Sequence, residues 1–182
     1  LMDSKVVAAE DIKGIGVTGQ GEGCWLIDKE GKPLQNAILW CDGRAVAEVH
    51  KITEEHPEIG KLYHRTTGTP PLLGNQMMLL RWMKSHRKDV LDKGYKILFC
   101  KDWIRYNLTG KIGTEITDSF TSLIDAQTGK IAEDLMKELD IFEYRDYLPD
   151  PVDSDEVVGT ILNSVAEETG LAKGTPVVAG AL

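Results

Sequence analysis

Apolar residues in the first quarter of the chain fall in short runs that are separated by turn signals. The runs cover residues 12–18, 24–28 and 37–40, and each has the length of a strand rather than of a helix. Gly31 and Pro33 lie between the second and third runs and indicate a turn. The pattern therefore predicts a three-stranded meander at the start of the chain.

From residue 44 the spacing of apolar residues becomes helical. Ala45, Val46, Val49 and Ile52 recur at intervals of one to four residues, and Pro57 ends this run. The Gly- and Pro-rich residues 60–75 are predicted as a loop. Further helices are predicted at residues 77–88, 89–93, 101–108, 131–139 and 163–170. Apolar strands are predicted at residues 95–100 and 175–182.

Strands that come first and helices that alternate later are typical of an α/β or α+β fold with a mixed sheet. The chain has 182 residues, which suits one domain, or one domain and a fraction of a second. We find no internal repeat and no low-complexity segment. The sequence thus predicts an ordinary folded α/β chain.

Charge and cysteine content narrow the class of partner. The chain has 21 basic and 29 acidic residues and a formal net charge of −8, which disfavours nucleic acid and anionic membranes as partners. The cysteines Cys24, Cys41 and Cys100 are odd in number and far apart, which fits a cytoplasmic location and no metal site. Residues 1–10 are interrupted by charged side chains, so no signal peptide is expected.

A glycine-rich loop at residues 19–23 is the first candidate for chemistry. Its sequence is Gly-Gln-Gly-Glu-Gly, but no helix opens after it, so a dinucleotide-binding loop is disfavoured. Glycines here leave the polar side chains of Gln20 and Glu22 free to contact a ligand. Two interpretations stay open at this point, a ligand-binding tip and a tight turn with solvated polar residues.

Four blocks of sequence identify a resemblance that covers nearly the whole chain. Residues 16–45, 101–111, 113–122 and 174–182 resemble, in order and spacing, the FGGY family of carbohydrate kinases, which includes xylulokinases, glycerol kinases and erythritol kinases. The resemblance implies a ribonuclease H-like (actin-like ATPase) α/β domain with a mixed sheet flanked by helices. It also implies transfer of the γ-phosphoryl group of ATP, with Mg²⁺, to a hydroxyl of a sugar or polyol.

The resemblance also implies roles for individual residues. Gln20, Gly21 and Glu22 match a substrate-binding segment, in which a carboxylate at position 22 would accept hydrogen bonds from vicinal hydroxyls. Relatives carry a long side chain at the position of Gly21, so its absence leaves room for a different substrate. Trp103 is matched to a tryptophan that packs on the substrate carbon skeleton, and Ile116 to an apolar pocket wall.

Three further residues are expected to support the site. Asp42 and Arg44, in a Trp-Cys-Asp-Gly-Arg segment, are expected to pair with each other or with neighbouring loops, and Asp118 to order its own loop. For Trp103 the alternative is a core position in its helix. One residue is deleted between Asp118 and Asp125 relative to family members, which changes the pocket beyond Ser119.

The resemblance makes residues 1–182 most of an N-terminal, substrate-side kinase domain. The first strands with the phosphate loop and the C-terminal nucleotide-binding domain are expected outside these residues, and the general-base aspartate is expected just after Leu182. The full-length protein would then phosphorylate a pentulose, a tetritol or a pentitol, while the 182 residues alone would be inactive. The rival hypothesis is a non-catalytic sugar-binding or assembly module. A homodimer is also considered, and the substrate is not identified.

Overall fold

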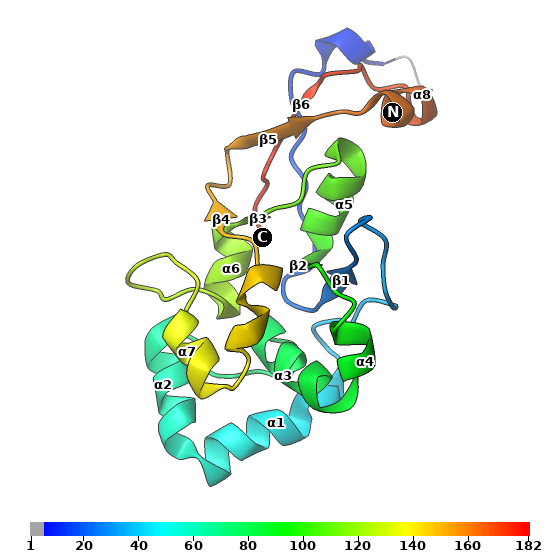
Figure 1. The fold of residues 1–182 in the computed structure, drawn as a ribbon. Helices are drawn as coiled ribbons and strands as arrows, with labels where there is room; N and C mark the ends of the chain where they lie inside the picture. Colours follow the sequence, from blue (N-terminus) through cyan, green and yellow to red (C-terminus); the bar gives the residue numbers. More distant parts are fainter. Residues whose placement is uncertain (1–5) are drawn as a thin grey trace.

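A computed structural model describes residues 6–182, so the first half of the 1–10 segment lies outside the described residues. The described chain is elongated (Figure 1). One end carries α8, β5, β6 and the N-terminal segment, and the other end carries most of the helices. The elements are η2 (Ala9–Asp11), β1 (Trp25–Ile27), η3 (Gly43–Ala45), α1 (Val46–His50), η4 (Lys51–Glu55), α2 (Pro57–Thr67), α3 (Gln76–His86), α4 (Lys88–Leu91), β2 (Lys96–Leu98), α5 (Cys100–Thr109), β3 (Thr114–Glu115), α6 (Ile116–Ser122), α7 (Glu133–Glu138), η5 (Phe142–Tyr147), β4 (Pro151–Val152), β5 (Val157–Thr160), α8 (Asn163–Thr169) and β6 (Pro176–Val178).

The strands of the described chain form three small two-stranded sheets. Strands β1 and β2 are antiparallel, β3 and β4 are parallel, and β5 and β6 are antiparallel. The predicted mixture of helices with parallel and antiparallel strands is therefore confirmed. The three-stranded meander is wrong in detail, because β1 pairs with β2, and residues 33 and 38 form only isolated bridges, with Ile27 and Cys24 respectively.

Segments distant in sequence meet beside β6. Ile15 forms a parallel bridge with Val177, in which the Ile15 amide donates to the Pro176 carbonyl at 2.9 Å. The predicted strand at residues 12–18 is thus present only as this bridge. On the other side of β6, the Ala179 amide donates to the Glu156 carbonyl at 2.8 Å. Residues 179–182 are in this way held against both the N-terminal segment and the β5 region.

Helix boundaries follow the local signals that the sequence carries. Gly110 and Gly170 end α5 and α8 in the left-handed conformation, with φ values of 68° and 76°, as expected for helix C-caps. The predicted loop at residues 60–75 is wrong over its first half. Pro57 is the first residue of α2 and that helix continues to Gly68, which adopts φ 77°. Pro57 therefore starts a helix as well as ending one, because proline is favoured in a first turn.

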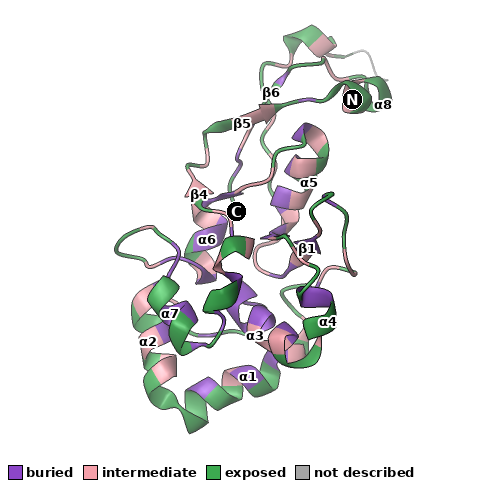
Figure 2. Ribbon diagram, viewed as in Figure 1, coloured by how far each residue is buried: buried purple, intermediate pink, exposed green. Residues whose placement is uncertain are grey.

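Helix α3 is the centre of the hydrophobic core (Figure 2). Five of its apolar side chains are at most 1% exposed: Met77, Met78, Leu79, Leu80 and Met83. They pack with residues of α1, α2, α4 and α7 and with β1 and β2 in one continuous cluster. The loop 19–23 and the start of α5 lie beside this core, which gives the candidate site a rigid support.

Candidate functional site

Glu22 lies in the glycine-rich loop in a left-handed backbone conformation, with φ 57°. This conformation is unusual for a residue with a Cβ atom and costs of order 1 kcal/mol or more unless the surroundings hold it. The neighbouring Gly23 also has a positive φ, 84°, and its amide donates to the Gly74 carbonyl at 2.9 Å. The loop is thus fixed in one shape by the segment that precedes α3.

The Glu22 carboxylate accepts three hydrogen bonds, two from the adjacent residues Asn75 and Gln76 and one from Ser122. Its Oε1 accepts from Asn75 Nδ2 at 2.7 Å, and its Oε2 accepts from Ser122 Oγ at 2.9 Å and from the Gln76 amide at 3.3 Å. Burial raises the pKa of Glu22, and the bonds from Ser122 and Asn75 oppose that rise. Two carboxylate oxygens offer about four acceptor positions, so the group keeps capacity for a ligand hydroxyl.

Trp40 is an exposed aromatic residue whose backbone lies against Gly74, in the segment that holds the Glu22 carboxylate. Its indole is on a residue that is 56% exposed, yet its backbone is fixed, because a Cβ on Gly74 would lie 2.1 Å from the Trp40 carbonyl oxygen. Asn75, which follows Gly74, is the residue that binds Glu22. The Trp40 backbone is thus tied to the segment that holds Glu22, while the residue remains open to solvent.

Trp40 stands in the Trp-Cys-Asp-Gly-Arg segment, but the sequence predicts no role for it. Its position at the end of an apolar run, directly before Asp-Gly, is the signal that could have marked it. Gln20 and Gly21 are half-buried in the same loop as Glu22. A Cβ on Gly21 would lie 2.6 Å from Leu182 Cδ1 and 3.3 Å from Asp118 Oδ1. Gly21 therefore lets the loop pack closely on Asp118 and Leu182.

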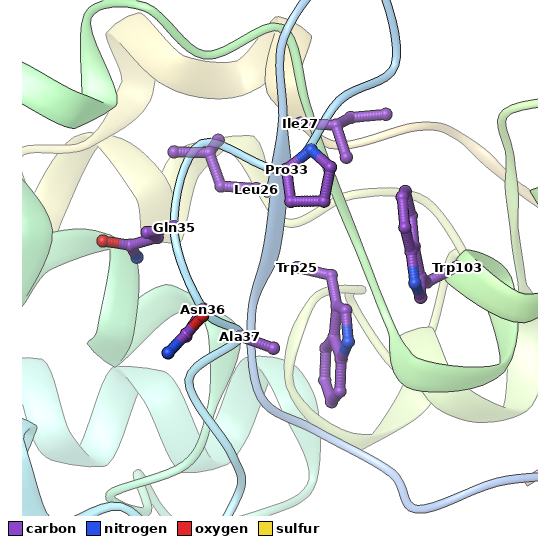
Figure 3. Close-up of a pocket in the computed structure, with 8 residues that line it drawn as sticks. All are labelled: Trp25, Leu26, Ile27, Pro33, Gln35, Asn36, Ala37 and Trp103. Carbon is purple, nitrogen blue, oxygen red and sulfur yellow. The ribbon is translucent and has the colours of Figure 1, made fainter.

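Trp103 lies on a different face of α5 from the residues that contact the loop. Lys101 and Arg105 are buried on one face, whereas Trp103, two positions after Lys101, is rotated by about 200° around a helix of 3.6 residues per turn. Figure 3 shows its indole across a hollow from Trp25, with Pro33 at the rim. Gln20, Gly21 and Glu22 do not line this hollow. The structure thus does not bring Trp103 together with the loop.

The remaining predicted residues are placed as follows. Ile116 opens α6, where it packs against the core, and its Cδ1 would lie 4.0 Å from a Cβ added at Gly129. Asp42 and Arg44 pair with each other, through two side-chain hydrogen bonds of 2.9 and 2.8 Å, and the Arg44 guanidinium lies 4.9 Å from the centre of a Trp82 ring. Asp118 is completely buried. Its carboxylate faces Lys101 at 2.8 Å.

A metal site does not emerge from the part of the chain that the structure describes. Within residues 6–182, no group of three or more His, Cys, Asp or Glu side chains is arranged to hold an ion. The same residues contain no helix with the length and hydropathy needed to cross a membrane.

Comparisons with known proteins agree on one family. The model of the FGGY family of carbohydrate kinases, N-terminal domain, matches residues 1–182. The chain is 38% identical over 182 residues to an L-xylulose/3-keto-L-gulonate kinase of Escherichia coli, covering 99% of this chain and 36% of the relative. It is 29% identical over 172 residues to an erythritol kinase of Brucella abortus, covering 94% of this chain and 33% of the relative.

A solved structure has the same fold. The xylulose kinase from Rhodospirillum rubrum matches with a TM-score of 0.83 and 27% identity, over 93% of this chain and 34% of that chain. The chain spans about a third of the length of the curated relatives it matches. The expected α/β fold is confirmed by this likeness.

Proposed function

Because the chain belongs to the FGGY family of carbohydrate kinases, we propose that the full-length protein transfers the γ-phosphoryl group of ATP to a hydroxyl of a sugar or polyol. Residues 1–182 then form the substrate-side wall of the active site. Among substrate classes we propose a pentulose or a small polyol, since relatives are named as kinases of L-xylulose and of erythritol. A cytoplasmic location is part of the same proposal.

The Glu22 carboxylate is the observation that carries this proposal. It is held by Asn75, Ser122 and the Gln76 amide, so its position is set before substrate arrives. A preorganised acceptor orients the reacting hydroxyl without paying for reorganisation during the reaction. We assign to the exposed Trp40, whose backbone packs on Gly74, an apolar surface for the C–H groups of the substrate.

The proton of the attacking hydroxyl is taken by a base outside these residues in our proposal. Leu182 lies against Gly21, and its amide donates to Thr117 Oγ1 at 2.8 Å, which supports a base in the chain that follows Leu182. ATP phosphates and Mg²⁺ would be held by other parts of the full-length protein. When bound, Mg²⁺ neutralises phosphate charge, and residues 1–182 contribute orientation rather than metal ligands.

The test is ADP release by the full-length protein over a panel of pentuloses, tetritols and pentitols, for the wild type and Glu22→Gln. We expect substrate-dependent turnover, with kcat/KM lower by about 10- to 100-fold in Glu22→Gln, since a hydrogen bond to a charged group is worth about 1.5–3 kcal/mol. Glu30→Gln, at an exposed position, is the matched control. No turnover on any panel member, with the protein folded, would refute the proposed function.

A further inference from the structure

A cluster of buried charges lies directly behind the glycine-rich loop. It contains two cations and three carboxylates, none more than 1% exposed: Lys101, Asp102, Arg105, Glu115 and Asp118. Full burial of five ionisable groups is costly and is compensated only where the groups pair with one another. The formal charge of the cluster is −1 when all five groups are ionised.

Lys101 is the central member of the cluster. Its Nζ lies 2.8 Å from a Glu115 oxygen, 2.8 Å from Asp118 Oδ2 and 3.5 Å from Asp102 Oδ1. Arg105 Nη2 lies 3.1 Å from the same Asp102 oxygen. Burial lowers the pKa of Lys101, but its three carboxylate neighbours outweigh burial and raise it, so the ammonium is charged.

Glu115 extends the cluster into the start of α6. Its oxygens accept from the amides of Thr117 and Asp118 at 2.6 and 2.8 Å. Burial alone would raise the pKa of Glu115, but Lys101 and these amides hold it at about 2. The carboxylate therefore stays ionised and fixes both Lys101 and the first turn of α6.

The cluster contacts the glycine-rich loop, residues 19–23, on one side. A Cβ on Gly19 would lie 3.5 Å from Lys101 Cβ, and a Cβ on Gly21 would lie 3.3 Å from Asp118 Oδ1. The distance at Gly19 is ordinary van der Waals contact, whereas the distance at Gly21 is tight, so the loop backbone rests directly on Lys101 and Asp118 and leaves no room for a side chain at position 21. The placement of Glu22, the next residue, thus depends on where these two side chains lie.

The same cluster touches residues 179–182 on its other side. Arg105 Nη1 donates to the Ala179 carbonyl at 2.8 Å, and the Leu182 amide donates to Thr117 Oγ1 at 2.8 Å. Thr117 Oγ1 in turn donates to Glu115 Oε1 at 2.7 Å. One set of buried charges therefore fixes the loop that carries Glu22 and the segment that leads out of Leu182.

We propose that Lys101 is a positioning residue for the phosphoryl transfer, acting through Asp118 and Glu115 to hold the Glu22 loop and residues 179–182 in one mutual geometry. This inference rests on the proposed function, because it needs both segments to border the substrate. Lys101 itself contacts no substrate in this scheme. Its loss misplaces the groups that orient the hydroxyl and the base, and a displacement of about 1 Å is enough to cost 100-fold in rate.

The experiment compares three forms of the full-length protein: wild type, Lys101→Met and the double variant Lys101→Met/Asp118→Asn. The single variant leaves three carboxylates against one cation and is expected to unfold at lower temperature. The double variant restores the formal charge of −1 and should recover most of the melting temperature. Lys173→Met, at an exposed position, is the matched control. All assays are run well below the melting midpoint of each variant.

Activity and backbone protection are then measured together. We expect kcat of the double variant to stay lower by about 100-fold, with KM changed much less, while exchange of the Gly23 and Leu182 amides becomes at least about tenfold faster. The Leu26 amide, in β1, should keep wild-type exchange. A merely structural role would restore kcat in parallel with the melting temperature, and that result overturns the proposal.

Amide exchange separates this proposal from the proposed function. If wild type turns over none of the panel, the proposed function fails, and exchange alone decides whether the cluster fixes the two segments. Unchanged protection of Gly23 and Leu182 in the double variant overturns the positioning role whatever the activity. Faster exchange with wild-type kcat also overturns it, because the reaction would then not depend on that geometry.

Discussion

At the scale of single residues, the two tryptophans Trp40 and Trp103 differ in what surrounds them. Trp103 stands two positions after Lys101 in α5, and residues two apart on a helix do not face each other. In α5 they point in different directions, so Lys101 faces the loop and Trp103 faces Trp25 (Figure 3). Trp40, in contrast, is an exposed residue, and its backbone packs against Gly74.

Replacing each tryptophan by alanine in the full-length protein separates their roles. We expect Trp40→Ala to raise KM for the preferred substrate by about two- to tenfold, from loss of an aromatic contact worth roughly 0.5–1.5 kcal/mol, with little change in melting temperature. Trp103→Ala should lower the melting temperature, since the indole stacks on Tyr106 at 5.8 Å between ring centres, and leave KM unchanged. The measurements are steady-state kinetics and thermal unfolding.

A rise in KM for Trp103→Ala but not for Trp40→Ala would support Trp103 as a substrate-binding residue. An increase in KM for Trp103→Ala, seen under conditions where the variant is folded, would show that the hollow beside Trp25 is part of the site. In that case the sequence-based assignment would hold and Trp40 would be a surface residue.

At the scale of elements, the sequence predicts what local signals determine. The C-caps at Gly110 and Gly170 and the amphipathic helices α3 and α7 follow from glycine and from apolar periodicity. Strand partners do not follow, because β1 pairs with β2 across some 70 residues and nothing local encodes that pairing. The Lys101 cluster was missed for a related reason, since its carboxylates come from three elements.

The segment between α2 and α3 connects the core to the candidate site, and it offers an element-scale prediction. Gly74→Ala should destabilise the protein by about 1–3 kcal/mol, because the added Cβ would press on the Trp40 backbone. Gly43→Ala is the matched control, since an added Cβ there meets nothing within 4 Å. Urea unfolding of both variants measures the difference.

Steady-state kinetics provide a second measurement on Gly74→Ala and Gly43→Ala. Gly74→Ala also disturbs the partner of the Gly23 amide and the position of Asn75, so we expect KM to rise in parallel with the loss of stability. Equal unfolding free energies for Gly74→Ala and Gly43→Ala would show that the Trp40 segment yields easily and does not define the site.

At the scale of the whole molecule, the candidate site lies where distant segments converge. The loop 19–23, the Leu72–Asn75 region, α5, α6 and residues 179–182 meet near the middle of the elongated chain (Figure 1). Matched relatives are about three times as long as this chain. In our proposal the phosphate contacts and the general base belong to the remaining two thirds of such a protein. Residues 1–182 would then orient the substrate, and the rest of the protein would bind ATP and take the proton.

The isolated 182-residue chain provides the corresponding test. We expect it to release ADP only at the background rate with ATP, Mg²⁺ and the full substrate panel, because phosphoryl transfer needs positioned phosphates and a base as well as an oriented hydroxyl. Circular dichroism first establishes that the chain is folded, and the full-length protein serves as the active reference. Substrate-dependent turnover that stays with the chain through purification and disappears in Glu22→Gln would place the base within these residues, with Asp118, the buried carboxylate behind Gly21, as the first group to examine.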